Sequence, residues 1–394
     1  MEVVTAAPGS PAIGETIEAI ERAAEGAFFI VQTIHRDGAA ITQPEPGMRI
    51  RDGDGLVLIG RTPGTTSLFE PGDVAPHDRD IRTMPKLGYL LPTREQIMEG
   101  RPDAASLLAL AARAEALGYD SVWVGDSVLA RPRHDPLTLL AGVAGRVPRV
   151  ALGTAVLLPA LRNPVLLAHQ VVTLDQVSEG RFILGVGIAR DVPNIRAEFA
   201  ACGVPFEKRV GSMMEGLRLC RALWSGEAVD WNGRWELHGG VLAPTPHRVG
   251  GPPIWVGGNT AASLERVGKH FDGWFPNAPD AIRFAQQWRQ VRAIASAAGR
   301  DGSRLSAAMY LTLTVDDDNA RAAARMDGFL EGYYGAPAVV LRQRQAVYSG
   351  PVAGVAEWLD GFARAGATDL VLRFAGDHQH HLEAMAKVRA SLGW

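Results

Sequence analysis

The chain of 394 residues is too long for one ordinary core and favours two or three domain units, or one large barrel with a small module. Lys and Arg total 40 against 43 Asp and Glu, which leaves a formal charge of −3 and no broad cationic surface for nucleic acid or anionic lipid. Hydrophobic residues make up 47% and charged ones 21%, so neither general disorder nor a membrane protein is favoured.

The first 70 residues predict a small α+β module. Apolar residues at Ile13, Ile17, Ile20 and Ala24 have helical spacing, and the apolar run 28–34 predicts a strand. A second strand is expected at residues 56–59, after turn-forming Asp and Gly residues. Residues 71–85 carry several Pro, Gly, Thr and Asp residues without periodicity, which is typical of a linker.

From residue 86 onward, short apolar runs alternate with helical patterns in a regular rhythm. The spacing of about 30 residues is what a parallel strand, a crossover helix and the next strand require. The strands are expected at residues 87–91, 121–126, 150–157, 182–187, 253–257, 272–275, 306–315 and 369–374. Eight such units over residues 86–394 predict a (β/α)₈ TIM barrel. Residues 231–247 break the pattern and are interpreted as an insertion before the fifth strand.

The two cysteines, Cys202 and Cys220, cannot form a disulfide framework or a four-cysteine metal site. The N-terminal residues lack the basic stretch and apolar run of an export signal, and the most apolar region, residues 150–172, is interrupted by Pro159 and Pro164. A cytoplasmic protein without a membrane span is therefore predicted.

In such a barrel, function is expected where strands end and helices begin. The segment Gly257, Gly258, Asn259 and Thr260 precedes a helix, where glycines and free amide groups suit a phosphate; the alternative is a tight turn alone. Residues 185–190 offer a similar turn but lack the third glycine of the dinucleotide fingerprint.

Asp126 directly follows the apolar run 122–124, which places a carboxylate at the carboxyl end of a strand. It is a candidate acid, base or hydrogen-bond acceptor, or alternatively a cap for the next segment. His134 is a second catalytic candidate, with solvated loop polarity as the alternative. The adjacent His380 and His381 come without a set of ligands at metal-binding spacing, so no metal site is predicted.

Four signatures in residues 86–394 resemble the bacterial luciferase-like family of flavin and deazaflavin oxidoreductases. They are LGYDSVWVGD at 117–126, LGTAVL at 152–157 followed by RNP at 162–164, the stretch 173–187, and PPIWVGG at 252–258. The resemblance implies FMN or a deazaflavin, coenzyme F420, at the carboxyl ends of the strands. The resemblance does not distinguish FMN from the deazaflavin, or oxygenase from dehydrogenase activity.

Several site residues follow from the resemblance by position. Ala155 and Val156 match the place of a non-prolyl cis peptide behind the isoalloxazine ring. The remaining cofactor-binding candidates match the family's phosphate and ribityl contacts or its RNP signature. They are Asn163, Gly187, Ile188, Ala189, Gly257, Gly258, Asn259 and Thr260. The family often has histidine after the acidic residue of strand two, whereas Ser127 follows Asp126 here.

The leading segment, residues 12–70, resembles the TrkA-C type regulatory module of potassium-uptake proteins, which implies dimerisation or regulation. An appended packing domain is the alternative. The sequence as a whole therefore predicts an oxidoreductase or monooxygenase that acts on a small organic substrate as a homodimer. A separate reductase that supplies reduced cofactor is a further expected partner. A non-catalytic sensor built on the same barrel is the alternative, and a cofactor-free lyase or isomerase ranks below both.

Overall fold

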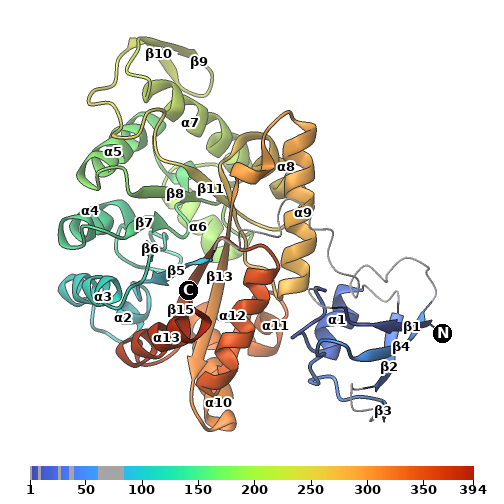
Figure 1. Cartoon of the computed structure of the whole chain (residues 1–394). Helices are drawn as coiled ribbons and strands as arrows, with labels where there is room; N and C mark the ends of the chain where they lie inside the picture. Colours follow the sequence, from blue (N-terminus) through green and yellow to red (C-terminus); the bar gives the residue numbers. More distant parts are fainter. Residues whose placement is uncertain (1, 8–9, 25–27, 35–39, 61–83) are drawn as a thin grey trace.

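The computed structural model describes residues 2–7, 10–24, 28–34, 40–60 and 84–394. Within residues 84–394, eight parallel strands close into a barrel that helices surround (Figure 1). The strands, in order around the barrel, are β5 (Lys86–Leu90), β6 (Ser121–Val124), β7 (Ala151–Thr154), β8 (Phe182–Val186), β11 (Ile254–Gly257), β12 (Gly273–Phe275), β13 (Ser306–Val315) and β15 (Asp369–Phe374). The (β/α)₈ prediction is confirmed, with every predicted barrel strand in place.

Helices follow the strands, and several of them begin at a residue whose side chain caps the first turn. Asp103 accepts hydrogen bonds from the backbone amides of Ala105 and Ser106 at the start of one helix. Asp135 caps the next helix by accepting a hydrogen bond from the Thr138 amide. The outer helices are α2 (Glu95–Met98), α3 (Ala104–Ala116), α4 (Pro136–Arg146), α5 (Pro164–Val177), α6 (Pro193–Ala201), α7 (Arg209–Leu223), α8 (Ala261–His270), α9 (Ala281–Ala297), α12 (Val355–Arg364) and α13 (His378–Leu392).

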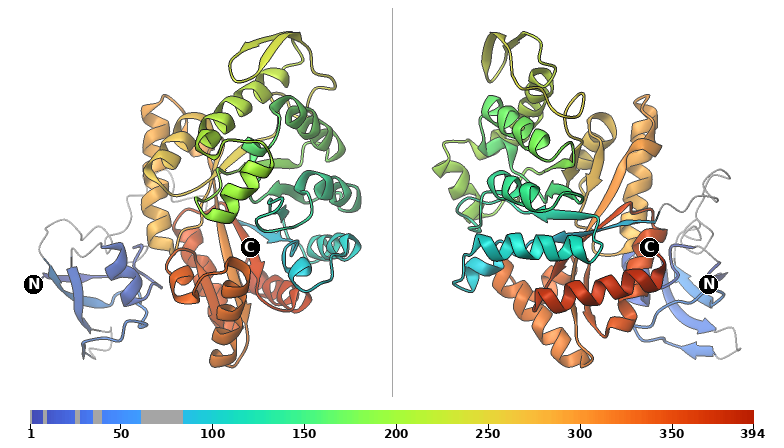
Figure 2. Two further views of the ribbon diagram at one scale, coloured as in Figure 1. Left: turned by 180° about the vertical axis from the view of Figure 1, so that it is seen from behind. Right: turned by 60° about the vertical axis from the view of Figure 1, so that its left-hand side comes forward.

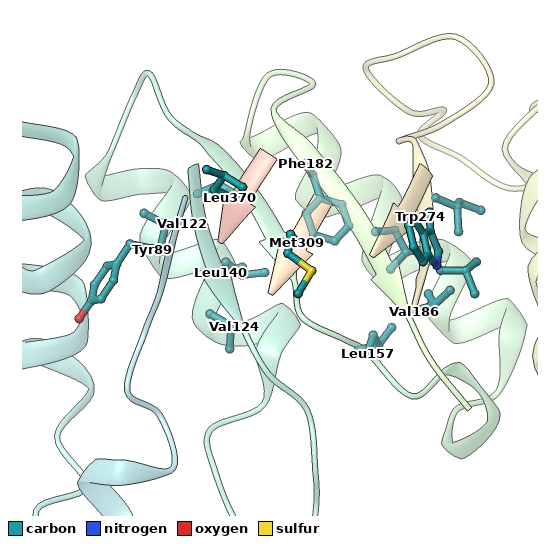
Figure 3. Close-up of a cluster of buried hydrophobic side chains, with 14 of the residues drawn as sticks. Tyr89, Val122, Val124, Leu140, Leu157, Phe182, Val186, Trp274, Met309 and Leu370 are labelled. Carbon is teal, nitrogen blue, oxygen red and sulfur yellow. The ribbon is translucent and has the colours of Figure 1, made fainter. Parts of the chain in front are cut away.

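Two apolar layers hold the barrel. Side chains on alternate positions of each strand point outward and pack against the helices, as Val122, Val124, Phe182 and Leu370 do (Figure 3). The opposite side chains fill the interior of the barrel, where Trp123 stacks near Trp255 with ring centroids 5.4 Å apart. The barrel is therefore a packed core, and open space is left only at its ends.

The barrel carries two insertions. The predicted one contains the hairpin β9 (Val229–Asn232) and β10 (Glu236–Gly240), before the fifth strand β11. The other was not predicted: α10 (Asn319–Tyr334), α11 (Ala338–Arg342) and β14 (Val347–Gly350) lie between β13 and β15, and β14 pairs with β13. Both insertions leave the barrel closed, because β8 pairs directly with β11 and β13 directly with β15.

The N-terminal residues form a small α+β unit beside the barrel (Figures 1 and 2). Its antiparallel sheet has the order β1 (Glu2–Thr5), β4 (Gly55–Gly60), β2 (Phe28–Ile34) and β3 (Ala40–Thr42). The helix α1 (Ile17–Ala23) starts four residues later than the apolar spacing suggested, because Thr16 caps it by accepting from the amide of Ala19. The predicted regulatory likeness stays a prediction, and most of the predicted linker lies outside the described residues.

The N-terminal unit packs on α9. Ile282 of α9 is fully buried in the same apolar cluster as Ile17, Ile20 and Leu58 of the unit. Among the described helices, none is long and apolar enough to cross a membrane.

Glu15 lies at this interface and should make its stability depend on pH. Burial, followed by the neighbouring Asp280, raises the pKa of Glu15 to about 7 from its usual 4.5. The folded state then holds a proton that the unfolded chain releases between pH 4.5 and 7, so stability is highest below pH 4.5 and falls as the pH rises to 7. Glu15→Gln removes this penalty and is expected to stabilise the protein by about 2–3 kcal/mol at pH 8.

Guanidinium-induced unfolding of both proteins at pH 4.5 and pH 8 measures this effect, with little difference expected at pH 4.5. The matched control is Glu18→Gln on the exposed side of α1, where loss of the 2.8 Å ion pair with Arg22 should cost at most about 0.5 kcal/mol. A Glu15→Gln protein that is less stable at pH 8 would contradict the prediction.

Candidate active site

A cavity of about 800 Å³ lies at the carboxyl ends of the barrel strands, a volume in the range that holds small molecules. Most of the predicted site residues line it, although they come from four separate loops of the chain. These residues are Asp126, Ala155, Val156, Gly187, Ile188, Ala189, Gly257, Gly258 and Asn259. Parallel strands bring these loops to one end of the barrel, which is why residues more than 130 positions apart share one cavity.

The main chain bends behind the cavity after β7. The peptide bond between Ala155 and Val156 is cis, as the family resemblance implied. On either side of the bend the backbone is hydrogen-bonded to neighbouring strands: the Ala155 amide donates to the Val124 carbonyl and the Leu157 amide to the Gly185 carbonyl, both at 2.8 Å. The bend is therefore a fixed part of the cavity wall.

Glycine keeps the space beside this bend open. A Cβ atom on Gly187 would lie 2.7 Å from Cγ2 of Val156, closer than side-chain atoms approach. Gly257 has only backbone and Val156 atoms near its missing Cβ, and Gly258 has a φ of +113°, which L side chains rarely adopt. The cavity thus has a floor of bare main chain and one valine.

Asp126 is engaged by a cation rather than free in the cavity. Its carboxylate accepts from Nη1 and Nη2 of Arg162 at 2.5 and 3.1 Å, and from the Leu158 amide at 2.9 Å. The Asp126 side chain is only 2% exposed and that of Arg162 15%. Arg162 also reaches Asp135 at 3.2 Å, so the pair ties together both ends of the loop between β6 and α4.

A second buried carboxylate holds the middle of that loop. Oε1 of Glu198, on α6, accepts from the Ser127 hydroxyl and from the amides of Val128, Leu129 and Ala130 at 2.5 to 3.1 Å. Sequence reasoning missed Glu198, because nothing local marks a glutamate that serves a loop about 70 residues away. The loop that covers one side of the cavity is thereby held at several points.

One wall of the cavity consists of tyrosine and arginine side chains that were not predicted. Tyr310 comes from β13, Tyr333 and Tyr334 end α10, and Arg131 and Arg133 come from the loop after β6. The adjacent tyrosines at the end of a helical run were a visible signal. Their approach to the barrel depends on the insertion after β13, which the sequence analysis did not resolve.

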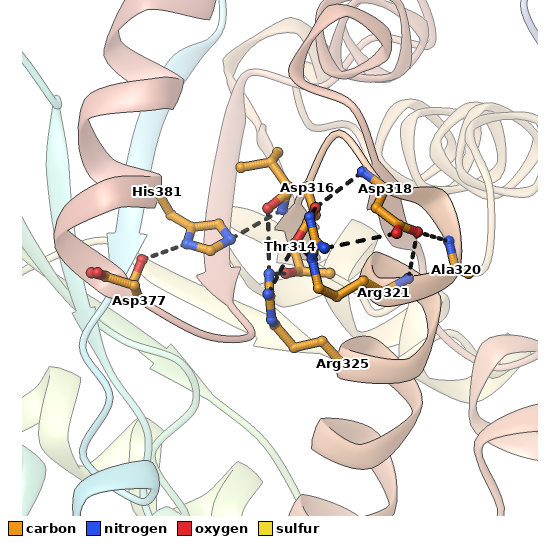
Figure 4. A network of polar contacts seen from close by, with 9 residues as sticks. Thr314, Asp316, Asp318, Ala320, Arg321, Arg325, Asp377 and His381 are labelled. Carbon is orange, nitrogen blue, oxygen red and sulfur yellow. Dashed lines mark hydrogen bonds and ion pairs between the residues drawn. The ribbon is translucent and has the colours of Figure 1, made fainter.

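The start of α10 is anchored to the barrel by a polar network (Figure 4). Asp316 accepts from Arg321 at 2.5 and 2.7 Å and from Arg325 at 3.0 Å, and these contacts, with Arg321 first, hold its pKa below the usual range. Nε2 of His381 accepts from the Val315 amide at 3.1 Å. The helix that carries Tyr333 and Tyr334 is thus fixed at its base.

Three predicted site residues do not line the cavity. Asn163 caps α5 by accepting hydrogen bonds from the amides of Val165 and Leu166. Thr260 caps α8 by accepting a hydrogen bond from the amide of Ser263. His134 also lies outside the cavity lining, and its buried Nδ1 has no hydrogen-bond partner among the described residues. Roles for these three residues in the reaction stay proposals.

Other polar groups were not predicted but do face the cavity. Gln287 donates to the Asn259 carbonyl at 2.7 Å while its buried Oε1 lacks a partner within the described chain. The buried Nε2 of Gln345 is likewise without one there. Arg22 and Ala23 of α1 reach the cavity lining as well, so the N-terminal unit forms part of its wall.

The C-terminal histidines have structural partners. Nδ1 of His378 is hydrogen-bonded to the Tyr89 hydroxyl at 2.8 Å, and burial lowers the pKa of His378 to about 3. In the parts of the chain that the structure describes, no group of three or more His, Cys, Asp or Glu side chains could hold a metal ion.

The sequence model of the luciferase-like monooxygenase family matches residues 84–393, which is the whole barrel. The chain belongs to this family. The match begins after the N-terminal unit.

Curated relatives of the chain include reductases and dehydrogenases. The chain is 32% identical over 209 residues to the 5,10-methylenetetrahydromethanopterin reductase of Methanolobus tindarius, covering 53% of this chain and 61% of the reductase. It is 30% identical over 249 residues to the F420-dependent glucose-6-phosphate dehydrogenase of Kineococcus radiotolerans, covering 60% of this chain and 70% of the dehydrogenase.

Solved structures support the same fold. The monooxygenase RslO1 from Streptomyces bottropensis superposes with a TM-score of 0.68 at 22% identity, covering 78% of this chain and all of that one. The coenzyme F420-dependent tetrahydromethanopterin reductase from Methanopyrus kandleri gives 0.62 at 18% identity, covering 77% and 97%. At these identities the likeness concerns the barrel alone.

Within this luciferase-like chain, Ser127 has a structural contact at the position where the resemblance implied histidine. Its hydroxyl donates to Glu198 at 2.8 Å and accepts from the Arg131 amide at 2.9 Å. The side chain beside Asp126 is therefore committed to the loop and is only 5% exposed.

Proposed function

We propose that the protein is a flavin- or deazaflavin-dependent oxidoreductase that acts on a small organic substrate. The observation that carries the proposal is the cavity of about 800 Å³ built against the bent main chain at Ala155 and Val156, in a barrel of the luciferase-like family. A deazaflavin is favoured over FMN, because curated relatives at 29–33% identity are named for coenzyme F420.

The residues present fit such a cofactor. Gly187, Gly257 and Gly258 leave the space that Cβ atoms would fill, and Val156 offers an apolar surface to a flat ring. Oε1 of Gln287 and Nε2 of Gln345, which have no partner among the described residues, provide an acceptor and a donor for ring edges. The loop 187–190 and the start of α8 suit a phosphorylated side chain. When bound, a deazaflavin supplies hydride transfer, and FMN adds the activation of oxygen.

The chain's own part is to position reactants and exclude water. Asp126 is proposed to act through Arg162 and the Leu158 amide, which fix the main chain at the bend. Tyr310, Tyr333 and Tyr334 form the wall on which the organic substrate would rest. Rigid placement of the two reactants is worth several powers of ten in rate, because it replaces a chance encounter.

Separate titrations of the purified protein with FMN and with coenzyme F420, followed by tryptophan fluorescence, test the proposal. We expect micromolar binding of coenzyme F420 and weaker binding of FMN. Failure of both to bind would overturn the proposal. Binding without turnover of reduced cofactor over a panel of small ketones and alcohols would instead favour the sensor alternative, for which the contact of α1 with the cavity is the motivating observation.

Gly187→Val is expected to weaken cofactor binding at least tenfold while the barrel stays folded. The added side chain would overlap Cγ2 of Val156, and it would take up the space beside the bend. The control is Gly145→Ala on the exposed surface of α4, where no atom beyond the helix's own backbone lies within 4 Å of the new Cβ. Equal cofactor affinity in Gly187→Val and wild type would place the cofactor elsewhere.

A further inference from the structure

The tyrosine wall of the cavity is surrounded by guanidinium groups. The Arg373 guanidinium carbon lies 4.5 Å from the ring centroid of Tyr333 and 5.2 Å from that of Tyr334. Arg94 lies 5.1 Å from the Tyr333 ring and Arg131 5.2 Å from the Tyr334 ring. Each of the two tyrosine rings therefore has more than one guanidinium group close to it, an arrangement that cation–π attraction stabilises.

The protein balances the positive charge of this cluster only in part. Within the described residues, Arg94, Arg131, Arg133 and Arg373 form no ion pair within 4 Å, although the last is only 1% exposed. Glu95 is the buried carboxylate that acts on Arg94, Arg133 and Arg373, and burial raises its pKa. Buried cations without counterions are costly, so a cluster of this kind suits an anionic ligand.

Arg133 presents an unused donor to the cavity. Its Nε donates to the Arg131 carbonyl and its Nη2 to the Tyr333 hydroxyl oxygen, both at 3.2 Å, but no described group accepts from Nη1. A Cβ on Gly125 would lie 2.3 Å from this Nη1 and 3.5 Å from the Ala155 carbonyl oxygen. The free nitrogen is thus beside the bend where the redox ring is proposed to sit.

A second donor lies next to it. Because the Tyr333 hydroxyl oxygen accepts from Arg133, its hydrogen is left for another acceptor. Both donors are fixed in place, since the loop that carries Arg133 is held by Glu198 and by the Asp126–Arg162 pair, and α10 is anchored at Asp316. A rigid pair of donors binds an anion without the entropic cost of ordering them.

We propose that Arg133 and Tyr333 form an anion-binding subsite, and that the substrate is a carboxylate carried on a flat apolar body. The assignment of the carboxylate as a substrate rests on the proposed oxidoreductase function, but binding of the carboxylate does not require a cofactor. A planar carboxylate matches one guanidinium nitrogen and one hydroxyl donor. The flat body follows from the aromatic side chains of Tyr310, Tyr334 and Phe275 that line the same cavity.

The first test compares benzoate with benzamide as probes of the wild-type protein by isothermal titration calorimetry at low salt. The two probes have the same shape and differ in charge. We expect benzoate to bind at least tenfold more tightly, and this preference to shrink as salt is added. Equal affinity of the two probes, or no binding of benzoate at millimolar concentration, would overturn the proposal. This test needs no variant and so does not depend on how a substitution folds.

The second test assigns the preference to its residues. Arg133→Gln should lose at least tenfold in benzoate affinity and leave benzamide unchanged, and Arg133→Lys should lose less because it keeps the charge. Tyr333→Phe, which keeps the ring and removes the hydroxyl, should lose about threefold to tenfold. The matched control is Arg146→Gln at the exposed end of α4, which removes the same charge away from the cavity. A benzoate affinity that is unchanged in Arg133→Gln, or that falls equally in the control, would contradict the assignment.

Titration of the same variants with coenzyme F420 and FMN tests the anion-binding subsite separately from the proposed oxidoreductase function. Benzoate binding without cofactor binding would keep the anion subsite and reject the oxidoreductase. Cofactor binding without a benzoate preference would keep the oxidoreductase and reject the carboxylate substrate.

Discussion

Asp126→Asn is expected to destabilise the protein by about 3–5 kcal/mol, because it leaves the largely buried guanidinium of Arg162 without its main counterion. The effect should appear as a lower midpoint of guanidinium-induced unfolding with an unchanged slope. The loop between β6 and α4 would also lose one of its fixed points, so we expect weaker benzoate binding together with lower stability.

Asp135→Asn is the matched control, because it removes the other carboxylate that contacts Arg162. Asp135 is 48% exposed, and asparagine keeps the cap of α4, so the loss should be at most about 1 kcal/mol. If Asp126→Asn abolished turnover with stability unchanged, Asp126 would act in proton transfer rather than in holding the loop.

Gly185→Ala should destabilise the protein about as much as Asp126→Asn, for a different reason. A Cβ on Gly185 would lie 1.9 Å from the Thr154 carbonyl oxygen, an atom of the main chain that cannot turn away as a side chain does. The Thr154 hydroxyl also donates to the Gly185 carbonyl at 2.6 Å, so the two strands are in close contact at this point. We expect a loss of about 3 kcal/mol or more, or little soluble protein.

Gly328→Ala in the middle of α10 is the control for that substitution. No atom beyond its own helix backbone lies within 4 Å of its new Cβ, so a gain of about 0.5–1 kcal/mol is expected from the better helix propensity of alanine. Soluble yield and the unfolding midpoint are measured for both proteins. A Gly185→Ala protein as stable as wild type would mean that β7 and β8 separate at the bend at little cost.

The barrel was predictable because its signals are local and repeated. Each strand is a short apolar run bounded by turn residues, and several helices have a cap such as Asp103 or Asp135 next to their first residue. The cavity floor was predictable for a similar reason, since its glycines lie at the carboxyl ends of strands β8 and β11. The cis bond at Ala155 and Val156 came from the family resemblance and not from any local pattern.

Contacts across long separations were not predictable in this way. The partner of Asp126 is Arg162, and the group that holds Ser127 is Glu198, 71 residues away. A charged residue in a sequence looks the same whether it is solvated or buried against a partner, because burial is a property of the assembled loops. His134 shows the converse, since its place near Asp126 in the sequence did not bring it to the cavity lining.

The sequence by itself therefore determined the order of the eight barrel strands, the closed barrel and the end of it where the cavity lies, because these depend on periodicity and on turn chemistry within a few residues. Only the tertiary structure decided which polar groups meet in the cavity. Tyr333, Arg133 and the N-terminal Arg22 come from three distant segments, and their approach is set by how the insertion, the loop after β6 and the N-terminal unit pack on the barrel.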